Sequence, residues 1–280
     1  MTTVQRPEEQ QGAVDPARGR LFEDFVVGER FTSAPRTVTA DDLAAFTRLS
    51  GDDHPLHTGP GAILQGPFGV AVAMGLLQSL GLHGAGVQGL LDTHWSYRAP
   101  LRVGDTVRLE LTIVGCRRTR GGGRGIVTRH MRLVDDDGVV CQEGTTAALV
   151  TARGEGPDPV GRAFGTVVWG RAVVETLPPA FGGTLETWDG TVGLRCGDDE
   201  VHLRVYRGAV IDVSPRAPHG ATFTLAADEV TWLELVEGPD NPFMRLAMTG
   251  RFTVTGDGYE YLRLTAALVQ LADAAREVAR

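Results

Sequence analysis

The sequence is poor in the features that mark exported or membrane-spanning proteins. It has only three cysteines in 280 residues, Cys116, Cys141 and Cys196, and this odd, scattered set favours free thiols over a disulfide framework. Its longest apolar runs contain glycine and polar residues and are shorter than a membrane span. The polar, acidic N-terminus lacks the basic and apolar regions of a signal peptide. We therefore expect a cytoplasmic protein with no membrane span.

Further absences exclude several classes of chemistry. The formal net charge of −8 argues against general nucleic-acid binding, which needs a basic surface. The sequence contains no Gly-x-Ser-x-Gly pattern for a serine hydrolase. The glycine-rich stretch 120–125 lacks the Lys-Ser/Thr pair of a phosphate-binding loop. Because the cysteines and histidines also show no metal-ligand spacing, we expect no metal and no cofactor.

The remaining composition is that of a folded soluble protein. Hydrophobic residues make up 42% of the chain and charged residues 22%, and 280 residues are enough for two domains. Residues 1–20 are polar and are predicted to be a disordered lead-in. Residues 153–164 form a Gly/Pro-rich linker. These segments delimit a first domain at 21–152 and a second at 165–280.

The first domain is expected to combine helices with an antiparallel sheet. Thr39 and the acids after it are typical of a helix start, and this helix should end at Ser50-Gly51. The apolar run Gly66–Leu82, with Pro67 in its first turn, predicts a buried helix. Four alternating runs then predict strands at Thr93–Tyr97, Thr106–Val114, Ile126–Val134 and Val139–Val150. The predicted fold class is α+β.

The second domain is also predicted to be α+β. Asp228 should cap a helix that continues through Glu237, and a terminal helix should start at Tyr259. Strand patterns occur at Thr191–Cys196, Val201–Tyr206, Ala209–Val213, Ala221–Leu225 and Arg251–Thr255.

An acid and an imidazole lie between the two helices of the first domain. Asp52 and His57 are five residues apart in a loop whose shape Pro55 restricts. Such a pair can bind a water molecule and act as general acid and base. Backbone N–H groups near Gly66, at the start of the next helix, can polarise a carbonyl group. Singly, Asp52 is better explained as a turn cap and His57 as a loop residue, but the ordered group favours a catalytic site.

The segments 50–57, 65–67 and 97–105 resemble the MaoC-like, (R)-specific enoyl-CoA hydratases. The family pattern is Gly-Asp-x-Asn-Pro-x-His, in which Asp52 and His57 take the catalytic positions and His54 replaces the asparagine. The segment between His57 and Gly66 is shorter than usual in the family. The resemblance implies the hotdog fold, a curved antiparallel sheet around one long helix. It also implies a homodimer and an acyl thioester of CoA or acyl carrier protein as the substrate.

The second domain resembles sterol-carrier-protein-2-like domains, through the segments 189–192, 228–233 and 248–257. This resemblance implies an apolar cavity that holds a fatty acyl or other lipid chain. The alternative is a solid core that only braces a dimer.

Three functions remain open from the sequence. The first is hydration or dehydration of an enoyl or 3-hydroxyacyl thioester by Asp52 and His57. The second is hydrolysis of the thioester, with or without prior addition of an amine such as glycine to the double bond. The third is a lipid-binding protein without catalysis. The replaced residue His54 keeps the second function open, because it is either a spacer or a substrate contact.

Four arginines gather at a predicted hairpin tip, which also holds three consecutive glycines. The planar guanidinium group binds phosphate through two parallel hydrogen bonds. We therefore consider Arg118, Arg120 and Arg124 candidates to bind CoA phosphates or the acidic surface of a carrier protein. The alternative is a solvated hairpin whose arginines only increase solubility.

Overall fold

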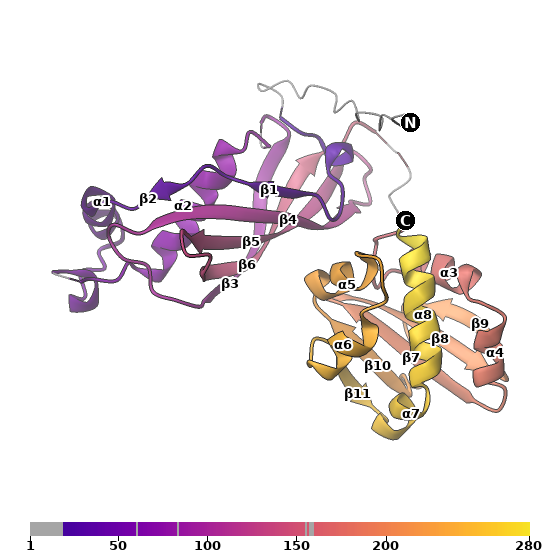
Figure 1. Cartoon of the computed structure of the whole chain (residues 1–280). Coiled ribbons are helices and arrows are strands. Elements are labelled where there is room, and N and C mark those ends of the chain that lie inside the picture. Colours follow the sequence, from indigo (N-terminus) through magenta and orange to yellow (C-terminus); the bar gives the residue numbers. More distant parts are fainter. Residues whose placement is uncertain (1–18, 60, 83, 155, 157–159) are drawn as a thin grey trace, which may run out of the picture.

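The computed structural model describes residues 19–59, 61–82, 84–154, 156 and 160–280 (Figure 1). The lead-in expected at residues 1–20 lies almost wholly outside the described residues. Two sheets with separate hydrophobic cores support the division into two domains. Within the described ranges, no helix has both the length and the apolar character that a membrane crossing requires.

The first domain contains one sheet, two α-helices and two short 3-10 helices. Its elements are η1 (Phe22–Asp24), β1 (Arg30–Thr32), β2 (Arg36–Thr37), α1 (Ala40–Ser50), η2 (Pro55–His57), α2 (Gly66–Ser79), β3 (Val87–Tyr97), β4 (Thr106–Arg118), β5 (Arg124–Asp135) and β6 (Val140–Thr151). The strands are antiparallel in the order β1-β4-β5-β6-β3, and β2 also pairs with β4.

Helix α2 packs on one face of this sheet (Figure 1). Strand β4 turns alternate side chains toward the helix, so Leu109, Leu111 and Ile113 are buried while the residues between them are partly exposed. From α2, Phe68 and Val72 join the same core. The structure therefore confirms the predicted antiparallel sheet with one buried central helix.

Local sequence signals explain both helices of the first domain. Thr39 accepts the Asp42 N–H, and Asp42 in turn accepts the Thr39 N–H, so α1 begins with the expected capping box. Gly51 ends α1 in the left-handed region, with φ of 74°, which glycine adopts readily. Helix α2 begins at the expected residue and ends at Ser79, three residues before the predicted Leu82.

The second domain is a five-stranded sheet with helices. Its elements are α3 (Val167–Thr176), α4 (Ala180–Thr184), β7 (Asp189–Cys196), β8 (Asp199–Tyr206), β9 (Ala209–Ser214), β10 (Phe223–Ala227), α5 (Glu229–Val236), α6 (Phe243–Met248), β11 (Thr253–Gly256), α7 (Gly258–Arg263) and α8 (Thr265–Val278). The strand order is β11-β10-β7-β8-β9, and β10 runs parallel to β7. In Figure 1, α8 crosses the near face of this sheet.

The helices of the second domain differ from the sequence prediction. Helices α3, α4 and α6 were not predicted at all. The terminal helix predicted from Tyr259 is two helices, because Leu264 has ψ of 13° and leaves the helical conformation between α7 and α8. Leu264 is buried in the core, so the break turns an apolar side chain inward. The Asp228 cap of α5 is confirmed by its side chain, which accepts the Thr231 N–H at 2.7 Å.

The two domains contact each other directly. Val27 and Val114 of the first domain are buried within the hydrophobic cluster of the second. Arg30 forms an ion pair at 2.5 Å with Glu237, the residue that follows α5. Arg162, from the segment predicted to be a linker, donates to the Val27 carbonyl at 2.5 Å. The described part of this segment therefore docks the domains against each other.

Among the described residues, none of the three cysteines forms a disulfide bond, as the sequence predicted. Burial raises the pKa of the Cys141 thiol to about 11 and raises the pKa of Cys196 as well. These two thiols therefore stay protonated near neutral pH.

Candidate active site

The loop between α1 and α2 holds the acid and both histidines of the predicted site. It leaves α1 at Gly51 and continues through Asp52 into η2, which ends at His57. Pro55 is the first residue of η2, where a missing N–H costs no hydrogen bond. Beyond His57, the loop is fastened to the segment that precedes β4, because Ile63 forms an isolated bridge with Arg102.

Asp52 and His57 face each other in this loop. The His57 Nε2 lies 3.7 Å from the Asp52 Oδ2. The His57 Nδ1 lies 2.7 Å from the Ile63 carbonyl oxygen, which can only accept a hydrogen bond. His57 must therefore carry a proton on Nδ1, and in the neutral ring Nε2 holds a lone pair directed toward Asp52. The side chain of His57 is 15% exposed and that of Asp52 is 44% exposed, so the pair is reachable from solvent.

The spacing of the pair suits a shared water molecule. A separation of 3.7 Å is too long for a direct hydrogen bond. It still places both polar atoms within hydrogen-bond reach of one water between them. An imidazole lone pair and a carboxylate that both contact one water can remove a proton from that water and later return a proton to the substrate.

His54 takes a structural position in the same loop. Its Nδ1 accepts the Leu56 N–H at 3.2 Å and so caps the start of η2. Its ring centroid is 6.2 Å from that of His57. Among the two alternatives left by the sequence, this geometry favours a turn-forming residue over a substrate contact.

Gly66 provides a backbone donor at the start of α2. Pro67 has no N–H, and the Phe68 N–H donates back to the Gln65 carbonyl at 3.0 Å. Within the described part of the chain, the Gly66 N–H has no acceptor. The ring of Tyr97 covers this position so closely that a Cβ on Gly66 would lie 2.9 Å from Tyr97 Cε1. The N–H expected to polarise a carbonyl is thus at the predicted residue, beside an aromatic ring.

Gln65 is a site residue that the sequence reasoning missed. Its side chain is buried, with 1% exposure, directly before α2. Its Nε2 donates to the Thr47 hydroxyl at 2.9 Å and to the Asp52 carbonyl at 3.1 Å, and so ties α1 and the Asp52 backbone to α2. Among the described residues its Oε1 is buried without a hydrogen-bond partner. The only sequence feature that pointed to Gln65 was its position next to Gly66.

Arg118 is held by several contacts within the chain, and its binding of phosphate stays a prediction. Its side chain is 10% exposed and forms an ion pair with Glu23 at 3.0 Å. The guanidinium also lies 4.9 Å from the centre of the Phe22 ring and donates to the carbonyls of Gly122 and Gly154. These partners use the group to fasten the hairpin to the N-terminal segment.

Arg120 and Arg124 are exposed at the same hairpin tip. The tip lies at the end of β4 farthest from the Asp52 loop, which contacts the chain just before β4 through Leu101 and Arg102. Because β4 has 13 residues, its two ends are roughly 40 Å apart. The structure therefore does not bring these arginines to the Asp52–His57 pair of their own chain, and their binding of phosphate stays a prediction.

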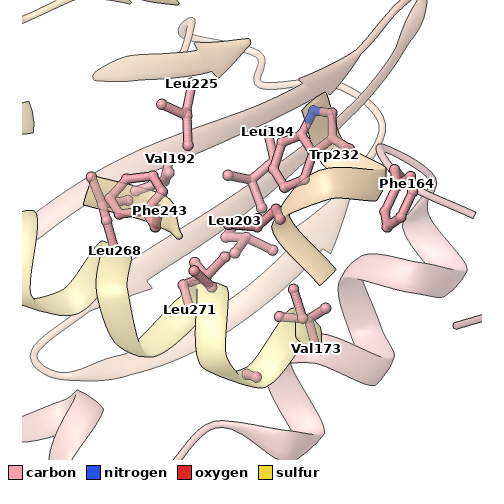
Figure 2. Close-up of a cluster of buried hydrophobic side chains, with 14 of the residues drawn as sticks. Phe164, Val173, Val192, Leu194, Leu203, Leu225, Trp232, Phe243, Leu268 and Leu271 are labelled. Carbon is pink, nitrogen blue, oxygen red and sulfur yellow. The ribbon is translucent and has the colours of Figure 1, made fainter. Parts of the chain in front are cut away.

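The interior of the second domain is apolar and rich in aromatic rings (Figure 2). Phe164 and Trp169 pack with Trp232, which also contacts Phe252, at ring-centroid distances of 5.2–6.0 Å. Helix α8 adds Leu268 and Leu271, which Figure 2 shows facing the strands. In the described residues, no group of three or more His, Cys, Asp or Glu side chains could hold a metal ion.

Comparison with known families agrees with both domains. Residues 24–132 match the MaoC like domain family, and residues 175–269 match the SCP-2 sterol transfer family. The chain joins a MaoC-like domain to an SCP-2 domain. Both resemblances seen in the sequence are therefore confirmed, and the first domain has the hotdog fold.

A relative of known name is similar to part of this chain. The 3-hydroxybutyryl-CoA dehydratase of Methylorubrum extorquens is 30% identical over 100 residues, which are 33% of this chain and 62% of that protein. The chain thus matches less than two thirds of this relative's length.

Solved structures similar to the chain include a MaoC-like dehydratase from Rhodospirillum rubrum, with 31% identity and a TM-score of 0.45. That match covers 48% of this chain and 99% of the other. The (R)-hydratase of A. caviae has 26% identity and a TM-score of 0.38, over 44% of this chain and 96% of its own.

Proposed function

We propose that the MaoC-like domain adds water to, or removes water from, an acyl thioester of CoA or acyl carrier protein. The observation that carries this proposal is the Asp52–His57 pair, with the His57 Nε2 lone pair 3.7 Å from the carboxylate. The relative from Methylorubrum extorquens, named as a 3-hydroxybutyryl-CoA dehydratase, supports the same class of reaction.

We assign each group a role in hydration. Asp52 and His57 hold a water molecule, and His57 takes one of its protons as the oxygen bonds to the β carbon of the enoyl group. The electrons of the double bond move toward the thioester oxygen, which the Gly66 N–H stabilises at the start of α2. The pair then returns a proton to the α carbon, which completes the 3-hydroxyacyl thioester. Dehydration is the reverse sequence.

One assay separates this function from its alternatives. We expect the full chain to consume the enoyl absorbance of crotonyl-CoA or a longer enoyl-CoA without releasing a free thiol, and to do so without glycine. Thiol release in the absence of glycine would identify a thioesterase. Thiol release only with glycine would identify amine addition followed by hydrolysis. If neither signal changed with CoA or carrier-protein substrates, the chain would be a lipid-binding protein without catalysis.

We propose that the SCP-2 domain holds the aliphatic chain of the substrate or of another lipid. The match to the SCP-2 sterol transfer family supports this, as does the apolar interior between α8 and the sheet. The aromatic cluster of Phe164, Trp169 and Trp232 fills part of that interior, so a chain has to pack against these rings.

Tryptophan fluorescence can test this second proposal. The chain has four tryptophans, and only Trp95 belongs to the first domain. In Trp95→Phe, we expect a conjugated fluorescent fatty acid to accept energy from the remaining tryptophans, with one site per chain. Binding without energy transfer in this variant would place the fatty acid in the first domain. If nothing binds, the SCP-2 domain has a solid core and serves as a structural brace.

A further inference from the structure

His54 closes the turn that carries His57. Its Nδ1 accepts the Leu56 N–H at 3.2 Å, and its carbonyl oxygen accepts the His57 N–H at 2.8 Å. A ring nitrogen that accepts a hydrogen bond carries no proton. The cap therefore exists only while the His54 ring is neutral with its proton on Nε2.

His57 needs the opposite tautomer. Its Nδ1 donates to the Ile63 carbonyl at 2.7 Å, and its Nε2 keeps the lone pair that faces Asp52. Two histidines in one short turn, with ring centroids 6.2 Å apart, thus hold their protons on different nitrogens. Both arrangements are lost when the rings take a second proton.

The surroundings of His54 leave its ring open to solvent protons. The residue is exposed. Its ionisable neighbours are Asp52, whose Oδ1 accepts the His54 N–H at 3.4 Å, Asp53 in the preceding position, and His57. Across the described ranges, no hydrogen bond or ion pair joins the ring to an ionisable side chain of another element. Histidine is the side chain that ordinarily changes charge between about pH 5 and 8.

We propose that His54 is a positioning residue whose protonation opens the turn carrying His57 and so lowers activity in mild acid. A protonated Nδ1 would set one N–H against another, because the Leu56 N–H points at it from 3.2 Å. An asparagine at this position offers a carbonyl oxygen to the same N–H and does not titrate. His54 thus performs a turn-forming task of asparagine and adds a sensitivity to pH.

The kinetic test compares the full chain with His54→Asn and His54→Ala, using crotonyl-CoA and measuring kcat/KM from pH 5 to 8. The expected effect of His54 on activity rests on the proposed hydratase function. We expect two protonations to inactivate the wild type, so that its acid limb approaches a slope of two, and one to inactivate His54→Asn. Normalised to activity at pH 8, the asparagine variant should retain several-fold more activity than the wild type at pH 5, because one protonation fewer removes it.

His54→Ala provides the matched comparison, because alanine offers no acceptor to the Leu56 N–H. It should lower kcat/KM across the whole pH range, including neutral pH, where asparagine should restore it. If the wild type and His54→Asn lose the same fraction of activity in acid, the proposal is wrong.

A second measurement needs no turnover. In the full chain uniformly labelled with 15N, ring correlations at neutral pH should show the proton on Nε2 of His54 and on Nδ1 of His57, with assignments from the His54→Asn and His57→Asn spectra. The Leu56 amide should titrate together with the His54 ring. If these NMR results were obtained but the chain had no hydratase activity, the role of His54 in the turn would stand and the proposed function would be refuted. The inference would be wrong if neutral His54 carried its proton on Nδ1. It would also be wrong if the chemical shift of the Leu56 amide did not change as the His54 ring was protonated.

Discussion

Asparagine in place of Asp52 or His57 should lower kcat for an enoyl thioester by about 10²-fold or more, the usual loss when a general acid or base is removed. Asp52→Asn keeps the Oδ1 that accepts the His54 N–H and removes only the charge. His57→Asn keeps an N–H that can reach the Ile63 carbonyl and removes the Nε2 lone pair. Steady-state kinetics on the purified full chain measure both losses.

Matched controls distinguish catalysis from folding. Asp53→Asn removes an exposed carboxylate next to Asp52, and His219→Ala removes an exposed imidazole from the second domain. Both should keep kcat within about twofold of the wild type, because exposed surface substitutions rarely disturb a fold. Circular dichroism and Tm should match across all four variants. A folded Asp52→Asn and a folded His57→Asn that both turn over normally would remove the pair from the mechanism.

The sequence allowed prediction where one local signal decides the structure. The Thr39 capping box, the buried run from Gly66 and the Asp228 cap each depend on neighbouring residues alone, and each begins its helix at the predicted residue. Strands β3, β4 and β5 extend beyond their predictions, and β6 is shifted by one residue. For β4 the pattern was followed to Val114, whereas the strand continues to Arg118 through a bulge between Ile113 and Gly115.

Prediction failed where distant contacts decide the structure. Helix α3 is rich in valine, which has a low helix propensity, and it forms because Trp169 and Val173 are fully buried in the core of the second domain. The parallel pairing of β10 with β7 joins strands that are far apart in the sequence. Periodicity identifies a strand but does not select its partner.

In the candidate site too, a local pattern predicted some residues, while distant contacts bring in others. Asp52, His54 and His57 lie within six residues, so their pattern predicted a shared turn. Gln65 joins the site because the fold brings its side chain to the Asp52 carbonyl, and Tyr97 joins because the end of β3 lies over Gly66. No local pattern predicts either contact. The arginine cluster in the sequence did not reveal that Glu23 and Phe22 contact the Arg118 side chain.

The full chain should be a homodimer, and we propose that strand β3 forms its interface. The sheet has short edges at β1 and β2, but β3 is an 11-residue edge strand with no partner on one side within the described residues. Long exposed edges are normally paired or covered. Leu90 and Leu91 are 53% and 52% exposed on it, which is an apolar surface that a second copy would bury.

A single charge can test this interface. Leu91→Arg should convert a particle of about twice 29.9 kDa into a monomer, because two copies would bring the added charges together at the strand pair. Val168→Arg places the same charge on an exposed apolar residue of α3 and should leave the dimer intact. Light scattering over a range of concentrations measures both.

Since β3 ends at Tyr97, whose ring covers Gly66, loss of the dimer should also lower hydratase activity. A wild-type chain that stays at 29.9 kDa at every concentration would rule out the dimer, and an unchanged Leu91→Arg dimer would place the interface on another surface.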